Sequence, residues 1–373
     1  MIIDFLIALI AFAIIITIVI TAHELGHFLG AKKTKTKVTE FVVGFPPFIW
    51  KKQIGETLFG IGAIPFGGYN KIHGEDESEV SKEDKSSYTS KTTPQKLLII
   101  ISGVIGNFIL SIILFYIVLF SSGLSVNIGL VNPDYKFPLG VQENYLLIGS
   151  VEENSTADYA SIKPNEIILT INSQKVENAD KLKTILEETK GEALAIYTEN
   201  IETKEKTFHL LNNNTDKIGI GYTNIVNISY NDNLVDKIFS GFFHTYNFAD
   251  YSLATLGHMI SKSFIQKDAS IASNALAGPV GIFAIIKVSL GQGFLYMINL
   301  IAIISLALAI TNLMPLPALD GGKCIYLLLQ EICPKVFTDK LSEKIDGVGF
   351  ILLMILGVLI VIKDVFQFKD LIF

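Results

Sequence analysis

The sequence predicts an α-helical polytopic membrane protein with a β-rich region beside the membrane and an inserted α/β domain. Half of the 373 residues are hydrophobic and only 18% are charged, which is little charge for the surface of a soluble protein of this length. The apolar residues are gathered in a few uncharged runs, whereas residues 140–230 have the composition of a soluble domain. This clustering disfavours the alternative of a large soluble protein with buried helices.

Four segments are predicted to cross the membrane, because a spanning helix needs about 20 apolar residues. The uncharged runs cover residues 5–22, 97–132, 288–319 and 348–362. The last run is short, but the side chain of Lys363 can reach from its end toward the lipid headgroups. The four helices are therefore expected within residues 1–32, 96–122, 291–322 and 346–373, with a loop at 323–345.

The lysines predict how these helices are oriented, because basic residues favour the cytoplasmic ends of spanning helices. All basic residues here are lysines, and they gather after the first helix, before the second, and at 323–344. We therefore expect residues 33–95 and 323–345 on the cytoplasmic side and residues 123–232 outside. The net charge of −6 gives no support for a nucleic-acid partner.

The segments outside the membrane differ in pattern. Residues 38–74 mix β-branched and aromatic residues with glycines and prolines, which predicts strands. Within 123–232, strand-like stretches flank "ADKLKTILEETK", whose apolar Leu182, Ile185 and Leu186 have helical spacing, so an α/β domain is expected. Residues 233–290 are apolar with scattered charges, which is typical of a helical segment on the membrane surface.

A candidate metal site lies at the end of the first uncharged run, in "TAHELGHFLGAK" at residues 21–32. On a helix His23 and His27 are about 40° apart around the axis, one turn from each other, so both imidazoles can reach one ion. Glu24 lies about 60° from His27 and flanks that ion. This pattern predicts a zinc hydrolase with two histidine ligands and a general base. A chance match is disfavoured because polar groups inside an apolar helix are costly.

Asp320, in "TNLMPLPALDGG" at residues 311–322, is the candidate third ligand. Pro315 and Pro317 interrupt the third helix, which is tolerated in a membrane only beside protein or a wet cavity. The alternative is an ordinary Asp-Gly turn. Each remaining histidine is more readily explained as an ordinary polar residue, with a role at the metal left open; these are His73, His209, His244 and His258.

The ordered set of motifs resembles the bacterial site-2 proteases, which are intramembrane zinc proteases of the regulator-of-sigma-E protease type. The set comprises "HELGH", "PFGGY", "SGVIGNF", an external domain and "TNLMPLPALDGG". The resemblance implies that zinc binds His23, His27 and Asp320, and that Glu24 is the catalytic base. It also implies a membrane-associated β-hairpin within residues 33–95 and a PDZ-like external domain at 123–232.

The same resemblance implies a set of substrate-binding residues: Asn312, Asn107, Gly67 and Gly68. Two of these assignments have open alternatives. Asn107 and Gly103 are four residues apart in "SGVIGNF", a spacing that also suits close helix packing through small residues. Gly67 and Gly68 also fit a plain β-turn.

The function expected from this resemblance is zinc-dependent cleavage of the transmembrane segments of single-span proteins, either anti-sigma factors or remnant signal peptides. The expected setting is the cytoplasmic (inner) membrane of a bacterium, with the lipid bilayer as a partner. A non-enzymatic scaffold that uses the PDZ-like domain is the main alternative, but it predicts the loss of a ligand or of the base, and none is missing. A transporter would show repeated broken helices, whereas one break is present.

Overall fold

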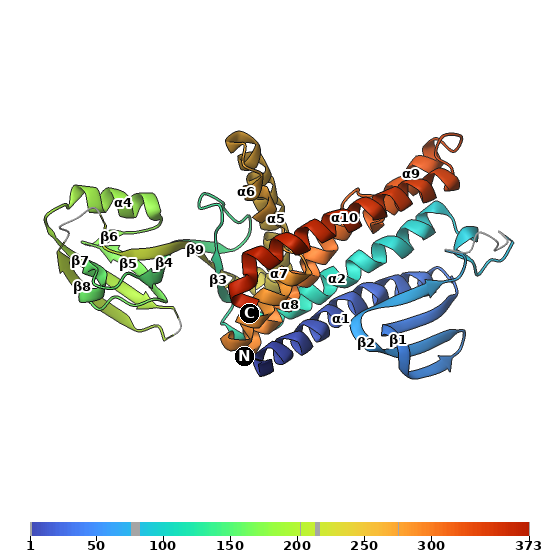
Figure 1. The fold of residues 1–373 in the computed structure, drawn as a ribbon, viewed down its shortest axis with the longest axis horizontal. Helices are drawn as coiled ribbons and strands as arrows, with labels where there is room; N and C mark the ends of the chain where they lie inside the picture. Colours follow the sequence, from blue (N-terminus) through green and yellow to red (C-terminus); the bar gives the residue numbers. More distant parts are fainter. Residues whose placement is uncertain (1, 76–82, 202, 213–216, 275, 373) are drawn as a thin grey trace. The chain divides into compact units, whose positions relative to one another are not determined.

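The computed structural model describes residues 2–75, 83–201, 203–212, 217–274 and 276–372. The chain forms two compact units, drawn in Figure 1. One unit combines residues 1–118 with 244–373, and the other comprises residues 119–243.

Four long apolar helices dominate the first unit: α1 (Ile2–Lys33), α2 (Thr93–Ser121), α8 (Phe294–Leu313) and α10 (Asp339–Ile372). Within the described residues, these four are long and apolar enough to cross a membrane. The four predicted apolar helices are therefore present as candidate spans. The third helix ends at Leu313, earlier than the predicted residue 322, because the two prolines that follow cannot continue it.

Glycines bring α1 and α2 into close contact between residues 22–30 of α1 and 99–106 of α2. A Cβ atom on Gly26 would lie 2.0 Å from the Ser102 carbonyl oxygen, and one on Gly106 would lie 2.3 Å from that of Ala22. No side chain fits at either position, so the two backbones approach as closely as small residues allow. This contact brings α2 up to the face of α1 that carries the histidines.

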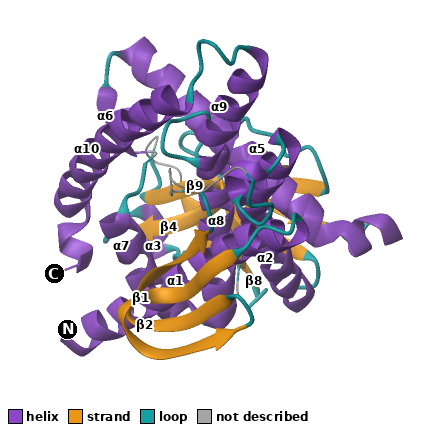
Figure 2. Ribbon diagram, turned by 90° about the vertical axis from the view of Figure 1, so that its right-hand side faces the viewer, coloured by secondary structure: helices purple, strands orange, loops and turns teal. Residues whose placement is uncertain are grey.

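The predicted strands of residues 38–74 form two long strands, β1 (Val38–Ile54) and β2 (Thr57–Ile72), shown beside α1 in Figure 2. Phe41 pairs with both Phe59 and Asn70, and so the first half of β1 lies between two segments of β2. Residues 68–72 therefore form an outer edge that, within the described chain, pairs with β1 alone. The Thr17 hydroxyl on α1 donates to the Pro65 carbonyl at 2.7 Å, which ties α1 to this sheet.

The second unit is built on an antiparallel sheet in the order β3-β9-β4-β5-β7-β8, with β6 paired to β5. Its strands are β3 (Ser125–Gly129), β4 (Val141–Val151), β5 (Glu166–Ile171), β6 (Gln174–Lys175), β7 (Ala193–Asn200), β8 (Lys206–Asn212) and β9 (Ile220–Ser229). The short helix α3 (Thr156–Tyr159) and the longer α4 (Ala179–Glu188) accompany them. The predicted apolar face of α4 is buried in the core through Leu182, Ile185 and Leu186.

The remaining helices lie before and after α8. The segment expected on the membrane surface is largely helical, with α5 (Leu234–Gln266), α6 (Ala269–Asn274) and α7 (Pro279–Ser289). Two single turns are present, η1 (Tyr88–Ser90) and η2 (Leu290–Gln292). Part of the predicted loop at 323–345 is instead helix α9 (Asp320–Ile332), which begins once the chain has passed the two prolines.

Candidate metal centre

Three side chains converge at the contact between α1 and the start of α9. The Nε2 atoms of His23 and His27 are 3.1 Å apart. The Oδ2 atom of Asp320 lies 3.1 Å from the first and 3.3 Å from the second. These three residues form the candidate metal-binding group found within the described residues.

The hydrogen bonds behind the imidazoles determine which nitrogens face this point. His23 Nδ1 lies 2.9 Å from the Asn107 Oδ1 atom, and His27 Nδ1 lies 3.0 Å from the Ile99 carbonyl oxygen. Both partners are acceptors, so each Nδ1 carries the proton in the neutral ring. Each Nε2 is then left with a lone pair that points toward Asp320.

Three electron-rich atoms therefore face one another, which is unfavourable unless a cation lies between them. The Oδ2 atom of Asp320 is buried and accepts no hydrogen bond within the described part of the chain. Tetrahedral zinc with ligand bonds near 2.0 Å keeps its ligand atoms about 3.3 Å apart, which agrees with the observed separations of 3.1 to 3.3 Å. The residues present thus fit a zinc ion in both chemistry and spacing.

Glycines make room for the ligands. A Cβ atom on Gly103 of α2 would lie 2.3 Å from His27 Nε2, so only glycine leaves space for that ring. At the start of α9, Cβ atoms on Gly321 and Gly322 would lie 2.3 Å from the Met314 carbonyl oxygen and 2.1 Å from that of Leu316. The two glycines let the chain fold back tightly after α8, and this turn carries Asp320 to the histidines.

A polar cavity of about 340 Å³ opens beside the three ligands. Glu24 and Asn312 line it, and Glu24 is half-buried. Sequence reasoning missed three further residues of its lining. Asn70 donates from Nδ2 to Glu24 Oε2 at 2.9 Å, and Glu75 forms an ion pair with Lys323 at 3.0 Å. A carboxylate beside a three-ligand metal site in a polar cavity is an arrangement that can deprotonate water.

Comparison with known proteins identifies the family. The model of the family described as "Peptidase family M50" matches residues 11–356. This chain belongs to peptidase family M50. It is similar to the "Putative zinc metalloprotease" proteins of Clostridium acetobutylicum, at 31% identity over 97% of both chains, and of Clostridium perfringens, at 30% identity over 96% of this chain and 97% of the relative.

A more distant relative has a more specific name. The regulator of sigma E protease of Haemophilus influenzae is 25% identical, over 97% of this chain and 99% of its own length. Family and relatives together make this M50 peptidase a zinc metalloprotease of the site-2 type. Its four apolar helices agree with a multi-pass membrane protein.

In this M50 peptidase Asn107 lies behind His23 and does not line the cavity. The Asn107 side chain is fully buried, and its Nδ2 atom donates to the Val19 carbonyl and to the Ser305 hydroxyl, each at 3.0 Å. No part of the amide is exposed in this structure, and the expected contact of Asn107 with substrate stays a prediction. Its hydrogen bond to His23 Nδ1 is of the kind by which a polar partner orients a metal-binding histidine. Ser305 joins it from α8, and in the sequence it is only one serine in an apolar run.

Gly67 and Gly68 lie within β2, so the alternative of a plain β-turn is wrong. Gly67 has a φ of +139°, a conformation that favours glycine. Gly68 pairs with Val43, and a Cβ atom there would lie 2.6 Å from the Val42 carbonyl oxygen. Neither glycine lines the polar cavity. Both belong to the part of β2 that runs beside α1.

The other histidines take no part in the candidate metal group of the described residues. His73 pairs with Asp84 at 2.9 Å, and His209 lies 3.0 Å from the Thr198 hydroxyl. His244 packs against aromatic rings of α2 and α5, and His258 lies on α5.

Cys324 lies in α9, four residues after Asp320. Burial, together with the nearby Asp320, raises the pKa of the Cys324 thiol to about 11, so the thiol is uncharged at neutral pH.

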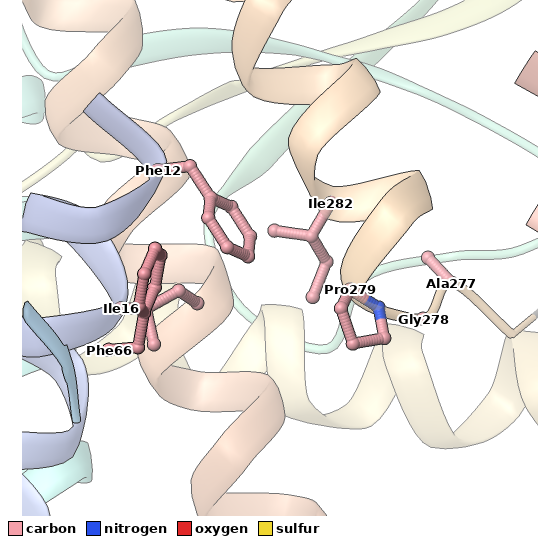
Figure 3. A pocket seen from close by; sticks show the side chains of 7 residues that line it. All are labelled: Phe12, Ile16, Phe66, Ala277, Gly278, Pro279 and Ile282. Carbon is pink, nitrogen blue, oxygen red and sulfur yellow. The ribbon is translucent and has the colours of Figure 1, made fainter. Parts of the chain in front are cut away.

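A second cavity, of about 360 Å³, lies where α1, β2 and α7 meet (Figure 3). Phe12, Ile16, Phe66 and Ile282 supply most of the side chains in this view, with Ala277, Gly278 and Pro279 at the start of α7. These residues offer no acid, base or metal ligand. The chemistry of the M50 peptidase therefore belongs to the polar cavity.

Proposed function

We propose that this chain is an intramembrane endopeptidase that cleaves transmembrane segments of single-span membrane proteins. The observation that carries this proposal is the triangle of His23, His27 and Asp320 with Glu24 beside it. The two histidines and Glu24 lie on α1, a helix apolar enough to span a membrane. A hydrolytic site on such a helix serves a substrate that lies in the membrane as well. Membership of the M50 family supports proteolysis of this general kind.

The residues of the polar cavity have different roles in the proposed reaction. His23, His27 and Asp320 would hold zinc, which when bound supplies the Lewis acidity that lowers the pKa of water to about 7 and polarises a carbonyl. Glu24 accepts the proton of the attacking water and returns it to the nitrogen of the leaving amine. Asn107 and the Ile99 carbonyl hold the two imidazoles so that both Nε2 atoms face one point.

The substrate is expected to enter the cavity as an extended segment. An α-helix with side chains is about 10–12 Å across, and its peptide carbonyls and amides are already paired. The outer edge of β2 at residues 68–72 offers backbone groups with which an extended segment can pair. We propose that Gly67 and Gly68 leave this backbone accessible and that Asn312, in the cavity wall, contacts the substrate strand.

The substrate class follows from the same proposal. The name of the relative from Haemophilus influenzae makes anti-sigma factors one candidate class, and remnant signal peptides are the other. The lysine distribution supports insertion in the cytoplasmic (inner) membrane of a bacterium with residues 123–232 outside. We propose that this external part is a PDZ-like domain, supported by its antiparallel sheet and by α4, whose apolar face is buried against the core of the unit.

The test is cleavage of single-span proteins reconstituted with the zinc-loaded protein in lipid vesicles. We expect the wild-type protein to cut within the apolar segment, located by mass spectrometry, and Glu24→Gln to leave the substrate intact. Equal cleavage by both proteins would exclude Glu24 as the base. A cut confined to the soluble part of every substrate would exclude the intramembrane assignment.

A further inference from the structure

Glu24, the proposed catalytic base, is held by the side chain of Asn70 in the sheet of β1 and β2. Asn70 lies in the edge segment of β2, and its Nδ2 atom is 2.9 Å from Glu24 Oε2 and 2.6 Å from the Glu24 backbone carbonyl oxygen. The two hydrogens of one amide group therefore both go to the same residue of α1. Asn70 and Glu24 are 46 positions apart in the chain, so this contact depends on the packing of the sheet against the helix.

The orientation of this amide follows from its partners. A carboxylate and a carbonyl are both acceptors, so the nitrogen of Asn70 must face them and its oxygen must face away. The Oδ1 atom is buried and has no hydrogen-bond partner within the described residues. An unpaired buried oxygen is unfavourable. The side chain nevertheless keeps its donors on Glu24, which marks these two bonds as the contacts that set its position.

Neighbouring charges are expected to displace the Glu24 carboxylate if this contact is lost. Its carboxylate shares a cavity of about 340 Å³ with Asp320, Glu75 and the ammonium group of Lys323. Lys323 attracts the Glu24 carboxylate, and the two other carboxylates repel it. Among the described side chains, Asn70 is the one that donates a hydrogen bond to Glu24. The amide thus fixes one carboxylate oxygen and leaves the other for proton transfer.

We infer that Asn70 is a positioning residue that holds Glu24 in the orientation needed to accept a proton. The inference rests on the proposed role of Glu24 as the base. It also links binding to chemistry, because Asn70 belongs to the β2 edge that is proposed to pair with the substrate strand. A strand added along residues 68–72 restrains the backbone that carries Asn70, and through the amide it restrains Glu24 at the moment when the peptide bond is in place.

The test compares Asn70→Leu and Asn70→Asp, which are close to asparagine in size, in the full-length zinc-loaded protein. Leucine removes the donor, and aspartate both removes it and places a negative charge against Glu24. We expect kcat to fall about 10- to 100-fold for leucine, as for a displaced catalytic group, and further for aspartate. KM for a fluorogenic transmembrane peptide and the zinc content per chain should stay within about twofold of wild type.

Thr39→Val is the matched control. It removes another side-chain hydrogen bond of the same sheet, from the Thr39 hydroxyl to the Lys71 carbonyl at 3.0 Å, next to Asn70 but outside the cavity. It should keep wild-type kcat. Asn70→Gln, which retains the amide on a longer chain, should recover part of the activity that leucine loses. A purely structural role predicts equal losses for leucine and glutamine, in step with a lower melting temperature.

The double variant Glu24→Gln with Asn70→Leu separates this inference from the proposed function. If Asn70 acts through Glu24, the residual cleavage of the double variant, followed over long incubations, is no slower than that of Glu24→Gln alone. Wild-type kcat in Asn70→Leu, or a change confined to KM, overturns the positioning role. In that case an inactive Glu24→Gln still supports the proposed function. Full activity of Glu24→Gln would instead overturn the role of the base itself.

Discussion

At the scale of single residues, the metal centre depends on which atoms carry hydrogens. The Asn107 amide oxygen and the Ile99 carbonyl take up the Nδ1 protons of the two histidines, so both Nε2 lone pairs point at Asp320. Asp320 supplies the only negative charge among the three proposed ligands. With zinc and one hydroxide the sum of charges is near zero, which is the least costly state for a site of low dielectric.

Replacing Asp320 with alanine should weaken zinc binding and abolish cleavage. The variant loses the single carboxylate ligand and keeps two neutral imidazoles. Loss of a residue that only orients a metal ligand lowers metal affinity about 10- to 100-fold, and loss of the ligand itself should lower zinc affinity further. Metal analysis of purified protein, together with competition against a chromogenic chelator, measures this. Wild-type zinc retention with continued cleavage would require another residue, such as His258, to be the third ligand.

At the scale of elements, α2, α8 and the sheet of β1 and β2 meet around α1. The glycines of α1 and α2 set the distance between these helices, Asn107 and Ser305 join α2 to α8, and Asn70 joins β2 to α1. Each contact fixes one side chain of the site. Small changes in how these elements pack should therefore appear first in zinc binding and catalysis.

Gly103→Ala tests the contact between α2 and His27. The added methyl group would lie 2.3 Å from His27 Nε2, so the ring has to move out of the ligand triangle. We expect zinc affinity and activity to fall at least about tenfold, as for other losses of ligand orientation. Gly257→Ala is the control, because a Cβ atom on that helical glycine meets nothing within 4 Å. Unchanged zinc affinity in Gly103→Ala would show that the helices can separate without cost.

Asn107→Ala tests the support of His23. The variant leaves the Nδ1 proton of His23 without its acceptor and opens a space between α1, α2 and α8. Zinc affinity should fall about 10- to 100-fold, while KM for substrate stays close to wild type, because the amide does not line the cavity. A rise in KM with normal zinc binding would instead support the direct substrate contact first expected for this residue.

At the scale of the whole molecule, the chain combines a membrane-embedded peptidase unit with a separate unit of soluble composition. The sequence has no arginine, so this second unit cannot clamp a peptide carboxylate with a bidentate guanidinium. Binding of protein C-termini through backbone amides alone should be weak. We therefore expect this unit to act as a filter against bulky substrates more than as a recruiter.

Removing residues 123–232 while keeping α2 and α5 intact tests this expectation. Substrates with large folded ectodomains should then be cut, and substrates already trimmed by another protease should be cut at about the wild-type rate. Cleavage of matched trimmed and untrimmed substrates in membranes provides the measurement. The opposite pattern, in which untrimmed substrates stay intact and trimmed ones are no longer cut, would make the unit a recruiter.

The sequence by itself determined the four long apolar helices, the strands of 38–74, the buried face of α4 and the pairing of His23 with His27. These features depend on hydropathy and on spacing within a few turns, which are local properties of the chain. It also indicated Asp320, because two prolines and one charge stand out at the end of an apolar run. Peptidase family membership agrees with the ordered motifs that pointed to it.

Only the tertiary structure decided which polar residues support the site. Asn107 meets His23 across 84 positions and Ser305 across 198, and Asn70 meets Glu24 across 46. A single serine or asparagine among apolar neighbours gives the same sequence pattern whether its side chain has only a packing role or positions a catalytic group. The difference arises from helices that approach through glycine and from a sheet edge that lies along α1, because such contacts form only once distant segments have packed together.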